Sequence, residues 1–440
     1  MPSLCGIATS YGNVWALTRG LTRQWPSDSW PSDSREVSDD RYLVGIPPLP
    51  RLRCAPVEIR DLEPDDIDAA LDARTRSFGP ISPEQRESWR EKTLRTIAER
   101  RMVACYDGTR LVATARINRF NQWWHGRSLP MAGVGGVVVI PEYRGQGVGR
   151  RLMHGVLQRA TELGDSISAL YPATVRLYRR CGWELAGAQY LVTVPAAALR
   201  ELGRVTVPVR RVGPDDIDDI LAVVRRIHTA ARSSGPIDWH ADEARHWLAD
   251  DRPFAYLAPD GFLAYRWEGQ DFFVDELVAG SGETARALWA LVGSGSSFVE
   301  TVRASVGPAD PLRWLLKENV VRPYDERRWM FRVVRLVDAL TERGYPASVD
   351  TELTFTVTDE QCPENTGTWR LSVTKGVGRV ERGSPEEPGL RLDARGLAAL
   401  YAGTPVRVLR DAGIADAGDP EADDAFDAVF AAQPYLLDYF

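Results

Sequence analysis

The segment that decides the fold is Val137–Met153, VVVIPEYRGQGVGRRLM. Its first four residues are apolar and mostly β-branched, which predicts a buried strand that ends at Pro141. A turn with three glycines follows, and then an apolar pattern with helical spacing at Leu152, Met153 and Val156. A strand, a glycine turn and a helix in this order form a place to hold a phosphate. Glycines let the main chain approach closely, and the first helical turn presents unpaired N–H groups at the positive end of the helix dipole.

The turn, Arg144-Gly145-Gln146-Gly147-Val148-Gly149-Arg150, distinguishes between kinds of phosphate loop. A Walker loop ends in Gly-Lys-Ser/Thr and a dinucleotide-binding loop requires G-x-G-x-x-G, and this turn has neither. An R-G-x-G-x-G turn after a V-x-V-x-P strand resembles the acetyl-CoA pyrophosphate loop of the GNAT N-acyltransferases. In that interpretation Gly145, Gly147 and Gly149 admit the cofactor, and Arg144 and Arg150 clamp its diphosphate. An ordinary glycine-rich turn between a strand and a helix is the alternative.

Composition indicates a globular protein with more than one domain. The chain has 440 residues, of which 44% are hydrophobic and 26% are charged. This length predicts about two to four domains. A net charge of −7 argues against a general nucleic-acid-binding role and mildly favours cationic ligands.

Cysteine and histidine usage does not indicate a metal site. The five cysteines contain no C-x-x-C pair, and the five histidines show no ligand spacing, so we expect neither a disulfide framework nor a bound metal. No apolar run approaches the roughly 18 to 20 residues of a membrane span. The N-terminal residues also lack the features of a signal peptide. We therefore expect a cytoplasmic protein with no membrane partner.

A long internal repeat organises most of the chain. Val57–Asp68 reads VEIRDLEPDDID, and Val207–Asp218 reads VPVRRVGPDDID. Each copy has a strand-like start and then Pro-Asp-Asp-Ile-Asp, whose acidic residues suit the first turn of a helix. The repeat predicts two α/β domains, at residues 57–205 and 206–335. Residues 1–56, which contain a twofold Trp-Pro-Ser-Asp-Ser repeat, are expected to be a flexible extension.

The two copies differ at the cofactor strand. In the first copy we expect strands at Met102–Tyr106, Leu111–Asn118 and Ser166–Tyr171, and a helix end with a turn at Leu177–Trp183. The corresponding part of the second copy, Asp275–Thr284, has no Arg-x-x-Gly-x-Gly. We therefore expect the second copy not to bind CoA.

A third unit, residues 336–440, has an α+β pattern. Strand-like alternation occurs at Thr351–Val357 and Thr368–Val373, followed by a short strand at Leu390–Asp393 and a helix at Ala394–Tyr401. This unit resembles the sterol-carrier fold. The whole order resembles the Eis (enhanced intracellular survival) N-acetyltransferases over about residues 57–440. The expected fold class is thus α/β (α+β): tandem GNAT domains, the second degenerate, followed by a sterol-carrier-like α+β domain.

The Eis resemblance implies an enzyme with acetyl-CoA as co-substrate and no metal. Main-chain N–H groups of Val137 and Val139 are implied to polarise the thioester carbonyl. Tyr178, in Leu-Tyr-x-x-x-Gly-Trp, is implied to protonate the leaving thiolate, since a phenol titrates near ~10. The base is implied to be the α-carboxylate of the last residue, Phe440. The apolar tail Gln433–Phe440 predicts docking, because each buried apolar side chain contributes on the order of 1.5 kcal/mol or more. A packed core tyrosine and a Phe440 packed within the third unit are the alternatives.

The expected acceptor is a primary amine of a small molecule or of a lysine side chain. Family members that acetylate aminoglycosides have carboxylates in the pocket, including one just before the last residue. Here that position is Tyr439, with Asp438 one position earlier, and Phe78–Ile81 also lacks an expected acid. These departures count against an aminoglycoside. The alternative function is a non-catalytic CoA- or lipid-binding module, although the intact loop at 144–150 argues against it. Hexamers occur in the family, so a homo-oligomer is expected.

Overall fold

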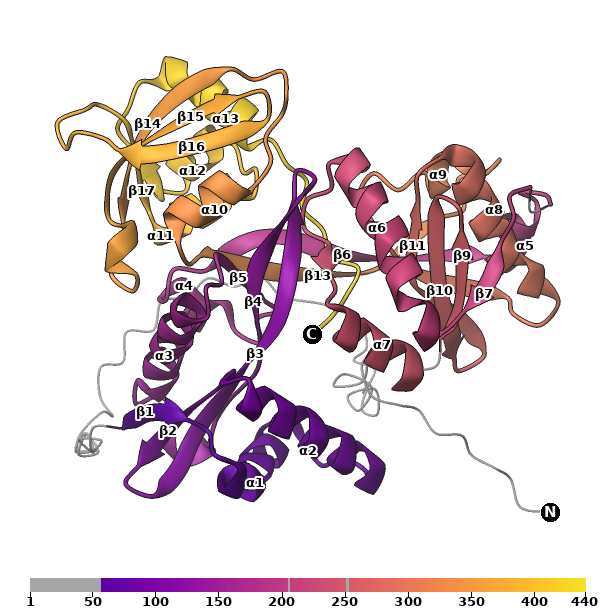
Figure 1. Ribbon diagram of the computed structural model, residues 1–440, viewed down its shortest axis with the longest axis horizontal. Coiled ribbons are helices and arrows are strands. Elements are labelled where there is room, and N and C mark those ends of the chain that lie inside the picture. The colour runs from indigo at the N-terminus through magenta and orange to yellow at the C-terminus, as the bar shows by residue number, and fades with distance from the viewer. Residues whose placement is uncertain (1–56, 205, 251–252) are drawn as a thin grey trace, which may run out of the picture.

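The structure is a computed structural model that describes residues 57–204, 206–250 and 253–440 (Figure 1). The predicted N-terminal extension therefore lies outside the described residues. A 13-stranded sheet runs through the first two units, and a separate five-stranded sheet forms the third. Helices and strands both contribute to every unit, which confirms the predicted α/β fold class. Within the described residues, no helix is long and apolar enough to cross a membrane.

The first unit begins with the repeated motif. Pro64–Asp66 forms a single 3-10 turn, and a helix begins directly after it at Ile67, which is buried. The elements of this unit are β1 (Glu58–Asp61), α1 (Ile67–Phe78), α2 (Pro83–Ala98), β2 (Met102–Asp107), β3 (Arg110–Trp124), β4 (Arg127–Val139), α3 (Val148–Glu162), β5 (Ile167–Leu170), α4 (Val175–Arg179), β6 (Glu184–Pro195) and α5 (Ala196–Arg200). The strand and the helix predicted on either side of the glycine turn are β4 and α3.

The second unit repeats this opening. Pro214–Asp216 again forms a 3-10 turn before a helix whose first residue, Ile217, is buried. Its elements are β7 (Arg210–Val212), α6 (Ile217–Ala231), β8 (Ile237–Asp238), α7 (Ala241–Asp250), β9 (Phe254–Ala258), β10 (Gly261–Glu268), β11 (Asp271–Ala279), α8 (Gly282–Gly293), β12 (Thr301–Val306), α9 (Leu312–Leu315) and β13 (Arg322–Val333). The same residues in the same register thus build the same local structure twice.

The sheets of the two units are joined by an inserted strand. The strand order is β1-β2-β3-β4-β5-β13-β6-β12-β11-β10-β9-β7, and the thirteenth strand, β8, pairs with β3 off this path. Strand β13, which ends the second unit in sequence, lies antiparallel between β5 and β6 of the first unit. Strand β6 in turn pairs with β12 of the second unit. Hydrogen bonding therefore crosses the sequence boundary at residue 205, and the two units share one sheet.

The third unit packs on one face of this shared sheet (Figure 1). It contains α10 (Leu336–Glu342), β14 (Thr351–Thr358), β15 (Gly367–Thr374), β16 (Val377–Arg382), β17 (Leu390–Asp393), α11 (Ala394–Tyr401), α12 (Val406–Asp411), β18 (Ala415–Asp416) and α13 (Asp423–Phe430). Its core continues into the first two units, since Trp124 of β3 and Phe331 of β13 stack with Tyr401 of α11. Large side chains of this unit, such as Phe355, Trp369 and Tyr401, are buried.

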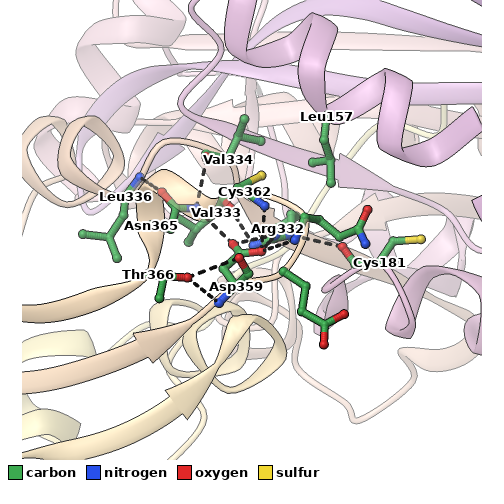
Figure 2. A network of polar contacts seen from close by, with 12 residues as sticks. Leu157, Cys181, Arg332, Val333, Val334, Leu336, Asp359, Cys362, Asn365 and Thr366 are labelled. Atoms are coloured by element: carbon green, nitrogen blue, oxygen red, sulfur yellow. Dashed lines mark hydrogen bonds and ion pairs between the residues drawn. The ribbon is translucent and has the colours of Figure 1, made fainter. Parts of the chain in front are cut away.

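A buried polar network fixes the third unit to the inserted strand (Figure 2). Nη2 of Arg332 on β13 donates to both carboxylate oxygens of Asp359, which follows β14, at 2.6 and 2.7 Å, and both side chains are almost fully buried. The guanidinium also donates to the carbonyl oxygen of Cys181, and Asn365 donates to Asp359. Since a buried charge is stable only when it is paired and hydrogen-bonded, these bonds position the third unit against the first.

Candidate active site

Strands β4 and β5 separate at the centre of the first unit. Their parallel pairing begins at Met131 with Ile167 and ends at Val134 with Leu170. Beyond this point β4 continues to Val139, whereas β5 stops. The edge of β4 that faces away from β3 therefore has no strand partner after Val134. Its main-chain N–H and C=O groups are available to an extended ligand.

A β-bulge aims the main chain of β4 into this opening. Between the pairs Thr114–Val138 and Arg116–Gly135, β4 has two residues where β3 has one. Gly136 takes a positive φ of +59° there. The N–H of Ile140 donates to Val112 of β3. Successive N–H groups of a strand point to opposite sides, so the N–H of Val139 points away from β3, and beyond the bulge the N–H of Val137 does the same. Both predicted oxyanion donors thus lie on the unpaired edge.

The glycine loop leaves the first turn of α3 open. Gly145 and Gly147 have φ of +74° and +85°, and a Cβ at either position would meet no atom within 4 Å. These glycines are therefore required by backbone conformation, and the space beside them is free. The first helical bond runs from the N–H of Arg151 to the oxygen of Gly147. The N–H groups of Val148, Gly149 and Arg150 consequently point out of the helix end, where they favour an anion.

The two loop arginines are placed differently. Arg144 donates through Nε to the carbonyl oxygen of Val139 at 3.0 Å and through Nη2 to the hydroxyl of Ser77 at 3.2 Å. It therefore ties the loop to β4 and α1. Arg150 lies 3.7 Å from the carboxylate of Glu360 in the third unit, and both side chains are mostly exposed. Their predicted contact with a diphosphate remains a prediction.

Tyr178 lies on α4 with its ring buried beside Trp183. Its hydroxyl makes no hydrogen bond within the part of the chain that the structure describes. Burial, with a smaller contribution from Cys181, raises the pKa of Tyr178 to about 12. The phenol is therefore neutral at physiological pH and has a proton to donate to a ligand.

The C-terminal tail leaves the third unit and docks on β6. The N–H of Leu436 donates to the main-chain oxygen of Ala188 at 3.2 Å. A Cβ at Gly187 would lie 2.1 Å from the oxygen of Pro434, so only glycine allows this approach. Leu436 and Leu437 are buried. The tail is ordered against the shared sheet, as its apolar composition predicted.

Side chains from three elements hold the main chain at the end of the tail. Gln189 of β6 and Ser305 of β12 donate to the carbonyl oxygen of Leu437 at 2.7 and 2.9 Å. The hydroxyl of Tyr171, just after β5, donates to the carbonyl oxygen of Asp438 at 2.8 Å. Because these bonds go to backbone atoms, they fix where the terminal carboxylate lies, whatever side chain the last residue carries.

The tail places Phe440 against the first unit. Its ring packs edge-on against Phe120 and Tyr171, with centroids 5.1 and 5.6 Å apart. Its carboxyl carbon and the Nη2 atom of Arg116 each lie 3.7 Å from the point where a Cβ on Gly135 would be. The terminal carboxylate and the Arg116 guanidinium therefore both lie close to Gly135 of β4, and Figure 1 marks the C-terminal end of the chain.

Three half-buried carboxyl groups surround this end of the tail. They are Asp438 of the tail and the neighbouring Asp275 and Glu276 of β11. Burial and then Asp275 raise the pKa of Asp438 to about 7, against the effect of a hydrogen bond from Trp239. Burial, then Asp438 and Asp275, raise the pKa of Glu276 to about 8. Arg266 pairs with Asp275 at 3.1 Å, so Asp438 and Glu276 are the two acids whose charged forms a bound cation would stabilise.

Sequence reasoning missed two of these three acids. Asp275 and Glu276 lie at the start of the segment that we interpreted only as a cofactor strand without its loop. The signal was the acidic pair itself, on a strand in the middle of a sheet. In the structure Arg266 pairs with Asp275 at 3.1 Å, and Glu276 is the member of the pair whose pKa is raised. The segment of the second unit that corresponds to the cofactor strand thus carries acidic side chains in place of a glycine loop.

In the second unit, the helix N-terminus that corresponds to the glycine loop, at the start of α8, is capped by a side chain. Ser281 caps α8 by accepting a hydrogen bond from the N–H of Thr284 at 3.2 Å. The hydroxyl of Thr284 donates to the carboxylate of Asp260. A capped helix end with a carboxylate beside it repels a diphosphate, which supports the expectation that this copy does not bind CoA.

Residues 57–204, 206–250 and 253–440 contain no group of three or more His, Cys, Asp or Glu side chains placed to hold a metal ion. The site is therefore described by its main-chain edge, its glycine loop, one tyrosine and four carboxylates.

Family models match three parts of the chain. Residues 58–186 match a model described as an acetyltransferase (GNAT) domain. Residues 235–336 match a second acetyltransferase (GNAT) domain model, and residues 336–437 match a sterol carrier protein domain.

Several proteins similar to this chain are named as N-acetyltransferases. A crystal structure of a GCN5-related N-acetyltransferase from Kribbella flavida is 43% identical, with a TM-score of 0.85 over 87% of this chain and 98% of that one. An uncharacterized N-acetyltransferase of Streptomyces avermitilis is 27% identical over 376 residues, 79% of this chain and 90% of that protein. N-acetyltransferase Eis of Mycobacterium tuberculosis is 28% identical over 243 residues, which cover 50% of this chain and 59% of that protein.

Proposed function

Since the chain belongs to the GCN5-related N-acetyltransferase family and is an Eis-like acetyltransferase, we propose that it transfers an acetyl group from acetyl-CoA to a primary amine. The amine belongs to a small molecule or a lysine side chain that carries further positive charge. The observation that carries the proposal is the position of the Phe440 carboxyl carbon, which lies 3.7 Å from the point where a Cβ on Gly135 of β4 would be.

Acetyl-CoA has two features that suit the first unit. Its diphosphate is an anion for the open N-terminus of α3, where Gly145 and Gly147 leave the space beside the main chain free, whereas Gly149 packs against Leu177. Its pantetheine arm carries amide groups that can pair with the free edge of β4. In that pose the thioester carbonyl accepts hydrogen bonds from the N–H groups of Val137 and Val139, which stabilise the charge that develops on its oxygen.

The transfer then needs a base at the amine. The carboxylate of Phe440 takes a proton from the amine as the nitrogen attacks the thioester carbon. The new C–N bond forms, the C–S bond breaks, and the electron pair leaves on the CoA sulfur. A base must lie within about 2.6–3.2 Å of the group it deprotonates, and the main-chain bonds to Leu437 and Asp438 hold the carboxylate in a fixed position for this.

Tyr178 acts on the leaving sulfur. A thiol titrates near ~8.5, and the pKa of Tyr178 is raised to about 12. Complete proton transfer from this phenol to the thiolate is uphill by about 5 kcal/mol at 1.36 kcal/mol per pKa unit. Tyr178 therefore stabilises the thiolate mainly as a hydrogen-bond donor, and the sulfur takes its proton as it meets water.

The carboxyl groups indicate the acceptor class. Asp438 and Glu276 lie near the end of the tail, and a bound ammonium group lowers their raised pKa values toward ordinary ones. A monoamine has only the reacting nitrogen to offer, whereas a polyamine or an aminoglycoside leaves a second cation for this cluster. The acids therefore favour an acceptor with at least two amino groups, in spite of Tyr439.

The test is CoA release, followed with a thiol-reactive dye, from acetyl-CoA and a panel of amines. Spermidine, an aminoglycoside and a lysine peptide are compared with matched monoamines such as a phenylalkylamine. We expect turnover with the polyamines and a KM at least tenfold higher for monoamines. Turnover confined to monoamines would contradict the acceptor class. Absence of both turnover and CoA binding would contradict the proposed function.

A non-catalytic lipid-binding role has little support. The interior of the third unit is filled by buried side chains such as Phe355, Trp369 and Tyr401. Assembly into hexamers and a cytoplasmic location remain predictions from the family resemblance and the sequence.

A further inference from the structure

A pocket of about 450 Å³ lies at the contact between the first and third units, beside the helix that carries Tyr178. We call it the arginine pocket. Its lining residues are Val175, Arg176, Arg179, Arg180 and Arg395. The first four belong to α4 or directly follow it, and Arg395 belongs to α11. Four guanidinium groups around one hollow are unusual in a chain with a net charge of −7.

One carboxylate balances part of this charge. Glu184, whose side chain is only 6% exposed, accepts bonds from Arg179 and Arg395, each at 2.7 Å. Burial raises the pKa of Glu184, but these bonds and one from the N–H of Leu185 outweigh burial and leave the pKa below its ordinary value. Glu184 is thus ionised, and its ion pairs fix Arg179 and Arg395 on one side of the arginine pocket.

The other two arginines have no such partner. Arg176 and Arg180 lie one helical turn apart on α4 and therefore project from the same side of the helix. Both are exposed, and within the described part of the chain neither forms an ion pair or a side-chain hydrogen bond. The arginine pocket therefore has two guanidinium groups available to a ligand, in addition to the two that Glu184 holds.

The arginine pocket is next to the glycine loop. Leu177, between these arginines, has a methyl carbon 3.4 Å from the point where a Cβ on Gly149 would be, so α4 packs on the first turn of α3. A CoA molecule whose diphosphate binds that turn carries another phosphate on its ribose, a few bonds away. This 3′-phosphate is a dianion, and guanidinium forks match phosphate oxygens in both charge and geometry.

We propose that the arginine pocket binds the 3′-phosphate of CoA, so that the third unit takes part in recognising the acetyl donor. The inference rests on the proposed use of acetyl-CoA and adds to it a site formed by α4 and the third unit. Arg176 and Arg180 contact the phosphate. Arg395, which belongs to the third unit and lines the same pocket, adds a further positive charge near this anion.

The test compares CoA with 3′-dephospho-CoA by isothermal titration calorimetry on the full chain, which needs no acceptor. Charge-assisted bonds of this kind correspond to a preference for CoA of roughly ten- to hundredfold. The double variant Arg176→Gln/Arg180→Gln is expected to lose that preference, with the affinity for 3′-dephospho-CoA unchanged within about twofold. Because neither side chain has a partner to lose, the variant is expected to fold as the wild type does.

The matched control removes two charges elsewhere, as Arg286→Gln/Arg407→Gln on α8 and α12, and is expected to keep the preference. Equal affinities for the two ligands in the wild type, or a preference that survives in the double variant, would overturn the assignment. Either result still leaves CoA bound and the proposed function intact. Failure of both ligands to bind would instead refute the proposed function and this inference with it.

Discussion

Moving the terminal carboxylate by one residue separates its chemistry from the packing of the Phe440 ring. In one variant, a single glycine is appended after Phe440, which keeps the ring and shifts the carboxylate. In the second, Phe440→Ala, the carboxylate stays and the ring is lost. Deleting Phe440 would change both at once and is therefore less informative. The main-chain bonds to Leu437 and Asp438 hold the tail in both variants.

The expected magnitudes follow from the geometry. An extended residue spans about 3.3–3.6 Å, whereas a base acts within about 2.6–3.2 Å. The appended glycine therefore takes the carboxylate out of reach of an amine held beside Gly135, and kcat is expected to fall by about 10²-fold or more. Phe440→Ala loses edge-on contacts with Phe120 and Tyr171, about 0.5–1.5 kcal/mol each. It is expected to lower stability and raise KM while kcat stays within about tenfold.

The assay is initial-rate CoA release, with kcat and KM measured for each variant and the melting temperature as a check on folding. If the glycine-extended protein keeps a kcat within about twofold of the wild type, the carboxylate is not the base. A Phe440→Ala protein that loses more kcat than the extended one would lead to the same conclusion and assign the effect to the ring.

Three further predictions concern single side chains. Tyr178→Phe is expected to lower kcat roughly ten- to hundredfold with the melting temperature unchanged, because its hydroxyl has no hydrogen bond within the described residues; an unchanged kcat contradicts its role. The raised pKa of Glu276, about 8, means that the folded chain holds this proton more tightly than the unfolded chain, so wild-type stability falls as the pH rises from about 4.5 to about 8. Glu276→Gln is therefore expected to raise the melting temperature more at pH 9 than at pH 5, and equal shifts would contradict this. Asp359→Ala leaves Arg332 buried without a counter-charge and is expected to cost about 3–5 kcal/mol in denaturant unfolding; a loss below about 1 kcal/mol would show that the pair does not hold the third unit.

Local patterns were sufficient to predict most of the elements. The strands expected at Met102–Tyr106, Thr351–Val357 and Leu390–Asp393 are present within one residue of their predicted ends. Alternation and β-branched residues act over short stretches, so they are visible in the sequence. Strand β3 extends beyond the expected Leu111–Asn118 to Trp124, because the hairpin with β4 continues to the turn at His125.

Long-range pairing could not be predicted in the same way. The sequence of β13 indicates a strand, but nothing in it specifies β5 and β6 as neighbours. The family resemblance, not the local sequence, led us to consider Phe440 at the active site. We overlooked Glu276 because we compared the second copy with the first only for the Arg-x-x-Gly-x-Gly loop, which the second copy lacks. Arg395 gave no signal, since its neighbours in the arginine pocket are more than two hundred residues earlier in the chain.

The insertion of β13 makes the order of synthesis a constraint on this protein. On the ribosome, the first unit has every residue of its glycine loop and Tyr178 long before β13 appears. Until then, β5 and β6 have an open gap between them, with two exposed strand edges that invite pairing with other chains. A gene fragment that ends near residue 205 is therefore expected to give an aggregating polypeptide, and the two halves of the repeat are no longer free to evolve as separate proteins.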